Sequence, residues 1–161
     1  MAEKVHLTLL ADGAQIEGDS SETTLERENT IECVQFDAGG RVPLSVTAAT
    51  GRRQYQPVRI VKPIDRATPK IAHAFATNQT VVGTFRFFRA SLSDGTTEHF
   101  FTVEIRDGVI ASIRQFVLDV LDSDLGTRPA LEEVTFAFNT IKWTWDDGGI
   151  EAEDTWTTVS R

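Results

Sequence analysis

The density of β-strand signals is the feature that most constrains how this chain can fold. Stretches rich in β-branched and aromatic residues follow one another along most of the sequence, and such residues favour strands. They predict strands at residues 5–10, 30–36, 55–61, 80–90, 99–105, 109–118, 134–145 and 151–158. Asp94-Gly95 and Asp147-Gly148 are typical of hairpin turns. Asp107-Gly108 is compatible with a turn or with a glycine bulge that bends one long strand.

A single helix is predicted, at residues 69–77. Thr68 is placed to cap the free backbone N–H groups, and Pro69 suits the first helical position. Ile71 and Phe75 are four residues apart and would share one face. One short helix packed on many antiparallel strands predicts a small barrel or a sandwich.

The composition is that of one globular domain. The chain has 161 residues, with 40% hydrophobic and 25% charged residues, so we expect one domain over residues 1–161 rather than a disordered or membrane-inserted chain. The amino terminus alternates polar and apolar residues and lacks the basic start and continuous apolar stretch of a secretory signal. We therefore expect folding in the cytoplasm. The single cysteine, Cys33, agrees with a reducing compartment and is a poor candidate nucleophile.

The charge balance argues against nucleic-acid binding. The formal net charge is -8, and Arg52-Arg53 is the one locally basic pair, whereas proteins that bind phosphate backbones usually present a basic face. An acidic surface keeps a protein soluble, and it makes self-association more favourable as salt screens the repulsion.

Two predicted strands carry apolar side chains on both faces. Side chains alternate along a strand, so the apolar face of residues 134–145 switches partway. The residues concerned are Val134, Phe136 and Phe138 on one face, with Ile141, Trp143 and Trp145 on the other. Residues 80–90 repeat this pattern, with Val81, Phe85 and Phe87 opposed to Val82 and Phe88. Either a bulge restores a single core face, or a neighbouring subunit covers the second face.

Residues 37–54 form a candidate contact loop. They contain two glycines in tandem and a proline, with weak periodicity, and loops of this length in compact domains are usually functional or disordered. Their apolar members favour docking onto a partner, and a mobile surface arm is the alternative. The candidate contact residues are Gly39, Gly40, Arg41, Val42, Leu44, Val46, Arg52 and Arg53.

Residue types with catalytic or metal-binding chemistry lack the spacing that such sites need. The histidines are scattered and show no HExxH pattern, and no GxSxG motif or phosphate-binding glycine loop is present. The acidic run after residue 118 lacks the glycine and closing glutamate of a calcium loop and is interpreted as a solvated connection. We expect neither an enzyme nor a cofactor or metal site. The residues considered are His6, His73, His99, Asp119, Asp122, Asp124, Asp146, Asp147 and the acceptor-like Asn78-Gln79-Thr80.

Three segments resemble one known family. They are GRRQYQPVRIVKPIDRATP at residues 51–69, SIRQF at 112–116 and EEVTFAFNTIKWTWDDGGIEAEDTW at 132–156. In this order they are similar to the haemolysin-coregulated proteins, the tube proteins of bacterial type VI secretion systems, over roughly residues 5–156. The resemblance implies an antiparallel β-barrel of two sheets with one short α-helix at its side.

The resemblance also implies a structural function. Family members form homohexameric rings that stack into a tube, which a contracting sheath propels with spike and baseplate proteins, and small effector proteins travel in the lumen. By position, residues 37–54 would be the extended loop that joins rings or subunits. The chain stops five residues after Trp156, so we expect no C-terminal effector extension and an effector carried as cargo. We expect export through the apparatus itself, without a signal peptide, nucleic acid or membrane insertion.

Two alternatives to this function are open. The chain could be the tube protein of another contractile machine, such as a phage tail or an extracellular injection particle. It could also be a monomeric β-barrel that binds a small ligand, with Trp143 and Trp145 lining a pocket.

Overall fold

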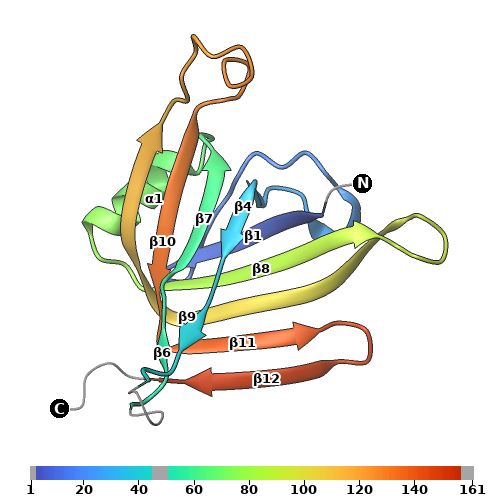
Figure 1. The fold of residues 1–161 in the computed structure, drawn as a ribbon, viewed down its shortest axis with the longest axis vertical. Helices are drawn as coiled ribbons and strands as arrows, with labels where there is room; N and C mark the ends of the chain where they lie inside the picture. Colours follow the sequence, from blue (N-terminus) through green and yellow to red (C-terminus); the bar gives the residue numbers. More distant parts are fainter. Residues whose placement is uncertain (1–2, 45–50, 157–161) are drawn as a thin grey trace.

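Antiparallel strands with one α-helix at their side make up the molecule (Figure 1). The computed structural model describes residues 3–44 and 51–156. The strands are β1 (Lys4–Ala11), β2 (Ala14–Ile16), β3 (Ile31–Cys33), β4 (Gln35–Asp37), β5 (Gly40–Arg41), β6 (Gln54–Tyr55), β7 (Val58–Pro63), β8 (Val81–Ala90), β9 (Thr97–Phe116), β10 (Leu131–Ala137), β11 (Thr140–Trp145) and β12 (Ile150–Thr155). The helices are α1 (Thr68–Ala76) and the short 3-10 turn η1 (Thr24–Glu26).

Strand β9 connects the two sheets. Its first half pairs with β8 and β11, and its second half pairs with β10, which in turn pairs with β7. Between these halves β9 has one extra residue relative to β8, since Val81 lies opposite Gly108 whereas Gly83 lies opposite Ile105. Asp107 adopts a left-handed conformation with φ 51° at this bend. The bulge interpretation of Asp107-Gly108 is therefore confirmed, and the two strands predicted on either side of it are one.

A second crossing between the sheets occurs at Val34. The predicted strand at residues 30–36 is two strands, because β3 pairs with β1 while β4 pairs with β7. The Val34 N–H donates to the carbonyl of Val61 at 2.8 Å, and the Val34 side chain is exposed. The strands follow one another in space in the order β2-β1-β8-β9-β10-β7-β4. Residues 31–37 thus join β1, near one end of this order, to β7, near the other end. The two sheets enclose the core between them, which confirms the mainly β, two-sheet fold predicted from the sequence.

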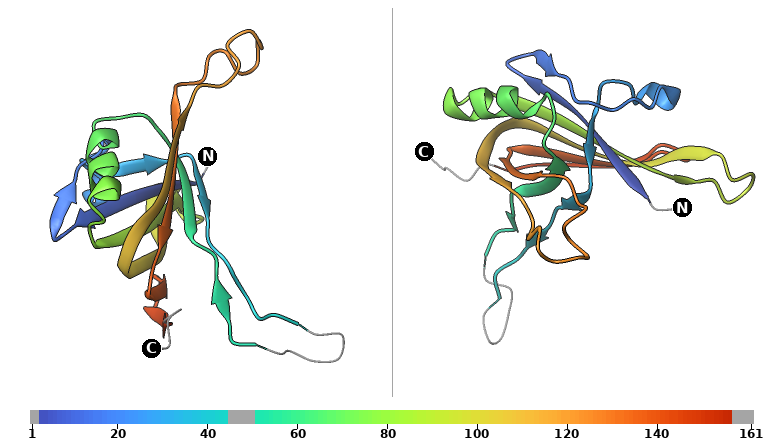
Figure 2. Two further views of the ribbon diagram at one scale, coloured as in Figure 1. Left: turned by 90° about the vertical axis from the view of Figure 1, so that its left-hand side faces the viewer. Right: turned by 90° about the horizontal axis from the view of Figure 1, so that it is seen from above.

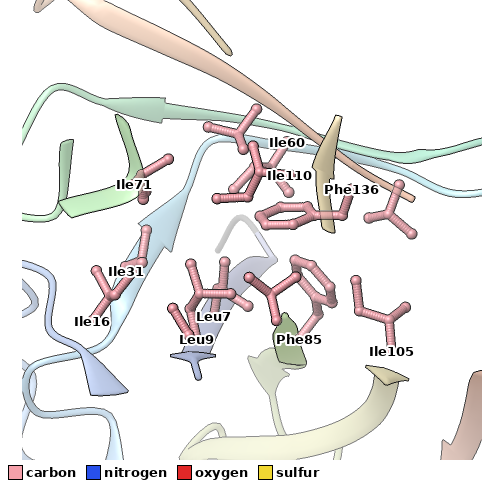
Figure 3. Packing of buried hydrophobic residues seen from close by; sticks show 14 of the residues in the cluster. Leu7, Leu9, Ile16, Ile31, Ile60, Ile71, Phe85, Ile105, Ile110 and Phe136 are labelled. Atoms are coloured by element: carbon pink, nitrogen blue, oxygen red, sulfur yellow. The ribbon is translucent and has the colours of Figure 1, made fainter. Parts of the chain in front are cut away.

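The core lies between these sheets and takes side chains from both (Figure 3). The predicted strand at residues 134–145 is interrupted at Phe138-Asn139, which changes the alternation of its faces. Phe136 and Ile141 are consequently both buried, as are Val134 and Phe138. The first of the two interpretations was a bulge, whereas the structure has an interruption between β10 and β11, and this interruption explains most of the double apolar pattern. Trp143 packs at the edge of the core, whereas Trp145 is 39% exposed.

The outer face of β8 is covered by the chain itself. Phe88 is buried there, with the guanidinium of Arg27 4.9 Å from its ring centroid and the His6 ring 5.3 Å away. Arg27 follows η1, which the sequence analysis did not predict. The second apolar face of β8 is therefore buried at Phe88 without a neighbouring subunit.

Helix α1 packs on β9 through Ile71 and Ala74, which are buried. Phe75 was expected to share the buried face, but it is 42% exposed. After the helix, Asn78 adopts a left-handed conformation with φ 52°, a common way to end a helix. This conformation explains the asparagine of the acceptor-like tripeptide Asn78-Gln79-Thr80.

The predicted role of Thr68 as the helix cap is wrong. The helix already includes Thr68, its N-cap residue is Ala67, and no side chain caps it. The Thr68 hydroxyl instead donates to Glu132 Oε2 at 2.8 Å and accepts the Asp65 N–H at 3.2 Å. Pro69 lies in the first turn, but at the second helical position and not at the predicted first one. The Thr68 hydroxyl therefore links α1 to Glu132 of β10 and does not cap the helix.

Glu132 belongs to a buried ion pair beneath the helix. It lies opposite Lys62 in the β10–β7 ladder, and Lys62 Nζ donates to its Oε2 at 3.0 Å. Both side chains are fully buried, and Lys62 also pairs with Asp65 at 2.9 Å. Because each buried charge has a partner, the cost of removing it from water is offset. The network ties the start of α1 to the sheet.

Candidate subunit-contact surfaces

The predicted contact loop at residues 37–54 protrudes from the body of the molecule (Figure 2). Its described parts, residues 37–44 and 51–54, are called the loop arms below. The arms contain β5 and Gln54 of β6, and these two strands pair in a separate two-stranded sheet. The sequence predicted one strand over residues 55–61 and none within residues 37–54, whereas Gln56-Pro57 separates β6 from β7 in the structure.

Close pairing of the loop arms depends on a glycine. Gly40 lies opposite Tyr55, and a Cβ at Gly40 would come within 3.0 Å of the Tyr55 side chain. The Gln56 N–H also donates to the carbonyl of Gly39 at 2.9 Å. Of the two glycines in the predicted contact set, Gly40 therefore has a structural role at the base of the loop, whereas Gly39 contributes its backbone carbonyl.

The other predicted contact residues point into solvent. Arg41, Val42, Leu44 and Arg52 are exposed, and Leu44 is 77% exposed. Val46 lies outside the described residues. An exposed apolar and basic surface at the end of a protrusion is suited to a partner that covers it.

A set of polar contacts, here called the latch, fixes the base of the loop to β12. Arg53 forms a two-pronged ion pair with Asp154, in which Nη2 donates to Oδ1 at 2.7 Å and Nε pairs with Oδ2. The Tyr55 hydroxyl donates to the same Oδ2 at 2.5 Å. Hydrogen bonds from Arg53 and Tyr55 hold the pKa of the Asp154 carboxyl below its usual range. The predicted contact residue Arg53 therefore has an internal partner.

Aromatic rings support the latch from the core side. The Tyr55 ring centroid lies 5.5 Å from that of Trp156, 5.6 Å from that of Phe138 and 6.2 Å from that of Trp143. Trp145 lies in a different environment, with its ring 6.1 Å from Phe100. The two tryptophans proposed to line a ligand pocket therefore contact different neighbours, and this alternative loses its main support.

A second exposed apolar segment lies between β9 and β10. Residues 117–130, called the β9–β10 connection, carry Val117, Val120 and Leu121 with their side chains exposed, and Leu121 is 92% exposed. Asp119 and Asp122 accept backbone N–H groups two residues later, both at 2.9 Å, as in Asx turns. The interpretation as a solvated connection is confirmed for the aspartates. The sequence analysis did not identify the apolar pair Val120-Leu121 between these aspartates, although the two residues are adjacent in the sequence.

The histidines occupy separate places. His73 is exposed on α1, whereas His6 is buried and His99 is half-buried near Asp146, at 3.3 Å. The Thr30 hydroxyl donates to the carbonyl of Arg27, so His6 Nδ1 is the donor in its 2.9 Å contact with Thr30. Burial lowers the pKa of His6 to about 4. His6 is therefore neutral over most of the physiological range.

His6, Glu22 and Glu32 bring possible ligand atoms within 4.8 Å of one another, a grouping that the sequence analysis missed. The three residues come from different segments, so no short motif marks them. Glu22 already pairs with Lys4 at 2.6 Å and with the buried Arg27. These two cations oppose the binding of a divalent ion, and we interpret the group as an ion-pair cluster.

Cys33 carries an unreactive thiol. Burial raises the pKa of Cys33 to about 12, so the nucleophilic thiolate is scarcely populated at neutral pH. This agrees with the prediction that Cys33 is a poor nucleophile. No helix in the described part of the chain has both the length and the apolar character to cross a membrane.

Similarity to known proteins extends over most of the chain. A family model described as "Type VI secretion system effector, Hcp" matches residues 8–145. The chain belongs to the Hcp family. The Major exported protein of Pseudomonas aeruginosa is 30% identical to this Hcp chain over 108 residues, which are 66% of this chain and 62% of that protein. The match thus spans less than two thirds of that relative's length.

Solved Hcp structures have the same fold. The structure of Hcp1 from the E. coli EAEC 042 pathovar is 26% identical, with a TM-score of 0.84 over 97% of this chain and 100% of that one. The secreted protein Hcp3 from Pseudomonas aeruginosa is 20% identical and has a TM-score of 0.75, over 98% and 100% of the two chains. The resemblance stated from the sequence is therefore confirmed at the level of family and fold.

Proposed function

We propose that this Hcp protein is the tube subunit of a type VI secretion system, that residues 1–161 act as one tube domain, and that it assembles into hexameric rings. Family membership across residues 8–145 is the observation that carries the proposal. The protruding loop arms, which present apolar and basic side chains at one end of the molecule, support an assembly role.

In this proposal the assembled tube carries out the function, and no catalytic site is needed. Stacked rings would form a channel, and small effector proteins would be held by weak contacts repeated on equivalent subunits. Sheath, spike and baseplate proteins would be the remaining partners. We expect the protein to be made in the cytoplasm and then exported; the name of the relative, Major exported protein, supports the export.

The solution mass tests the ring. Light scattering at low and moderate salt, followed by negative-stain imaging, should give a hexameric mass and ring-shaped particles. Growth of the assembly with salt is expected, because screening weakens repulsion between subunits that each carry a net charge of -8. A strict monomer at high concentration in both salts would instead favour the ligand-binding barrel.

The type of contractile machine has its own test. The family model favours a type VI secretion system over a phage-tail or extracellular particle. Pull-down of the tube from its native cells should recover a contractile sheath of the secretion system. Recovery of phage structural proteins instead would support the other machine.

A further inference from the structure

Residues 18–30, here called the Ω-loop, form a compact loop whose two ends meet. The Gly18 N–H donates to the carbonyl of Asn29 at 2.9 Å. A Cβ at Gly18 would lie 2.5 Å from the carbonyl oxygen of Thr30, so the ends approach this closely only because residue 18 is glycine. Arg66 fixes both ends, because it donates to the carbonyl of Gly18 at 2.7 Å and to Asn29 Oδ1 at 2.6 Å. Loops closed in this way are frequently functional.

Polar contacts rather than apolar packing hold the middle of the Ω-loop on the sheet. Its one large apolar side chain, Leu25, is 45% exposed. Arg86 of β8 donates to the carbonyls of Leu25 and Glu26, at 2.9 and 2.6 Å. Leu25, Glu26 and Asn29 have φ angles of 57°, 57° and 61°, a left-handed conformation that costs free energy for residues other than glycine. The middle of the loop would therefore open without exposing the hydrophobic core, which favours local over global unfolding.

His6 lies beneath the Ω-loop and is fully buried. Its Nδ1 donates to the Thr30 hydroxyl at 2.9 Å, and this hydroxyl donates to the carbonyl of Arg27 at 2.7 Å. Nε2 of His6 is also buried, and no hydrogen-bond partner for it occurs among residues 3–44 and 51–156. Protonation of Nε2 would place a charge and an unpaired N–H donor in a buried site, which costs free energy. The closed loop thus favours neutral His6.

Most charges around His6 also oppose its protonation. Arg27 places its guanidinium over the Phe88 ring, which the His6 ring contacts at 5.3 Å. Glu22 would attract a proton to His6, but its carboxylate already pairs with Lys4 at 2.6 Å and with Arg27. The charged groups that face His6 are Lys4 on β1, Glu22 and Arg27 on the Ω-loop, Glu32 on β3 and Arg86 on β8.

His99 is the second histidine of this region. It stacks on Phe88 with the ring centroids 5.1 Å apart, and it pairs with Asp146, which follows β11, at 3.3 Å. Because this carboxylate stabilises protonated His99, we assign the response of the Ω-loop to His6.

The direction of the pH effect follows from the environment of His6. Burial lowers the pKa of His6 to about 4, whereas the pKa would return toward 6.5 once the loop opens to water. The open loop therefore binds more protons than the closed loop between these values, and falling pH favours opening. A hydrogen bond from Lys4 lowers the pKa of the Glu22 carboxyl, so protonation of Glu22 acts in the same direction at a lower pH.

We propose that the Ω-loop is a pH-responsive lid, which opens locally when His6 is protonated while both sheets stay folded. Opening would release Arg27 from Phe88 and expose this ring at the outer face of β8. The lid belongs to the single subunit and does not rest on the proposed function.

Hydrogen exchange of the intact protein, analysed by mass spectrometry after pepsin digestion, tests the lid. The protein is labelled at pH 7 and at pH 5.5, both above its isoelectric point of about 4.8, with labelling times scaled for the intrinsic exchange rate at each pH. Peptides that cover residues 18–30 should lose protection by up to about eightfold at pH 5.5, the factor given by the two pKa values of His6. The amides that report the opening are those of Ser20, Arg27, Asn29 and Thr30.

Low concentrations of urea separate local opening from global unfolding. A local opening exposes little surface, so exchange through it should be nearly independent of urea, whereas exchange through global unfolding accelerates with urea. Peptides of β8 are the reference for global unfolding. Ω-loop peptides that exchange at the same urea-dependent rate as β8, or that are equally protected at both pH values, would overturn the proposal.

Substitution of His6 tests its role directly. His6→Gln should remove the change in Ω-loop exchange between pH 7 and pH 5.5, and His73→Gln, at an exposed position on α1, should retain it. An unchanged pH dependence in His6→Gln would overturn the proposal.

A second pair of variants applies even where His6→Gln does not fold. Glu22→Gln removes the ion pairs with Lys4 and Arg27 and should increase Ω-loop exchange already at pH 7. Glu28→Gln, at an exposed position in the same loop, should exchange as wild type does. Equal exchange in these two variants would mean that the charges do not hold the lid, and the proposal would be overturned.

Discussion

Buried aromatic side chains carry much of the packing at the scale of single residues. Phe136 is fully buried between the sheets, with its ring centroid 6.0 Å from that of Phe85 (Figure 3). Phe136→Ala should lower the free energy of unfolding by about 3–5 kcal/mol, because transfer energy is lost and a cavity remains. Phe138→Ala, also at a buried position, should have an effect of the same order. Urea titration measures both.

Phe75→Ala is the matched control, since this phenylalanine lies on α1 and is 42% exposed. It should change stability by a much smaller amount. Near-neutral effects at Phe136 and Phe138 would mean that the packing between the sheets is not the main source of stability there.

His6 should make stability depend on pH. Its pKa in the folded state, about 4, is below the unfolded value of about 6.5, so the unfolded chain binds more protons between these values. The contribution is complete above about pH 6.5 and is lost as pH falls toward 4. Among the charged groups that act on the pKa of His6, Glu22 raises it, whereas Arg27, Lys4 and Arg86 lower it.

His6→Gln should flatten part of this decline in the free energy of unfolding, measured by urea titration from pH 7 to pH 4. His99, whose pKa burial also lowers, should retain its share. His73→Gln, at an exposed helix position, should leave the pH profile unchanged. Equal profiles for wild type and His6→Gln would contradict the assignment of the effect to His6.

The latch acts at the scale of elements, because it joins the loop base to β12. Asp154→Asn removes the charge that pairs with Arg53, and we expect the Gln56 amide, which donates to the carbonyl of Gly39 at the base of the loop, to lose protection in hydrogen exchange. Global stability should change little, because ion pairs between solvent-exposed groups contribute little to stability. NMR hydrogen exchange measures the local effect.

Glu153→Gln is the control for the latch, since it removes a neighbouring carboxylate of β12 that pairs with Arg106. The Gln56 amide should exchange in this variant as in wild type. Equal protection in both variants would mean that the base of the loop keeps its structure without the ion pair.

The bend of β9 depends on Gly108. A Cβ there would lie 2.7 Å from the carbonyl oxygen of Ala137, a backbone atom that cannot move without disturbing β10. Gly108→Ala should therefore destabilise the fold by about 1–3 kcal/mol, as overpacking does. Gly39→Ala is the control, because its Cβ would meet nothing closer than 3.7 Å. Thermal unfolding compares the two, and equal midpoints would refute the close contact.

The positions of most strands could be predicted from the sequence, whereas the residues at which the strands begin and end could not. The residues predicted as strands lie mostly in strands, since β-branched and aromatic residues mark buried pleated surface. The breaks at Val34 and Asn139 arise where the chain passes from one sheet to the other, which depends on non-local pairing. The loop was found by its composition, but its latch joins residues 101 positions apart, which no local pattern reveals.

At the scale of the whole molecule, the loop is expected to be dispensable for folding. Replacing residues 42–52 by a short Gly-Ser turn keeps β5, β6 and the latch. Circular dichroism and thermal unfolding should remain near wild type, rings should form, and stacks should be lost. A collapsed fold in the shortened variant would show that the removed residues belong to the core.

Strand β9 belongs to both sheets, and this arrangement affects how the molecule would transmit force. If the tube is pushed along its axis, load passes from one sheet to the other through a continuous twenty-residue strand that is hydrogen-bonded in both. Separating the two sheets would require breaking backbone hydrogen bonds of β9, so we expect the sheets to resist such a load together.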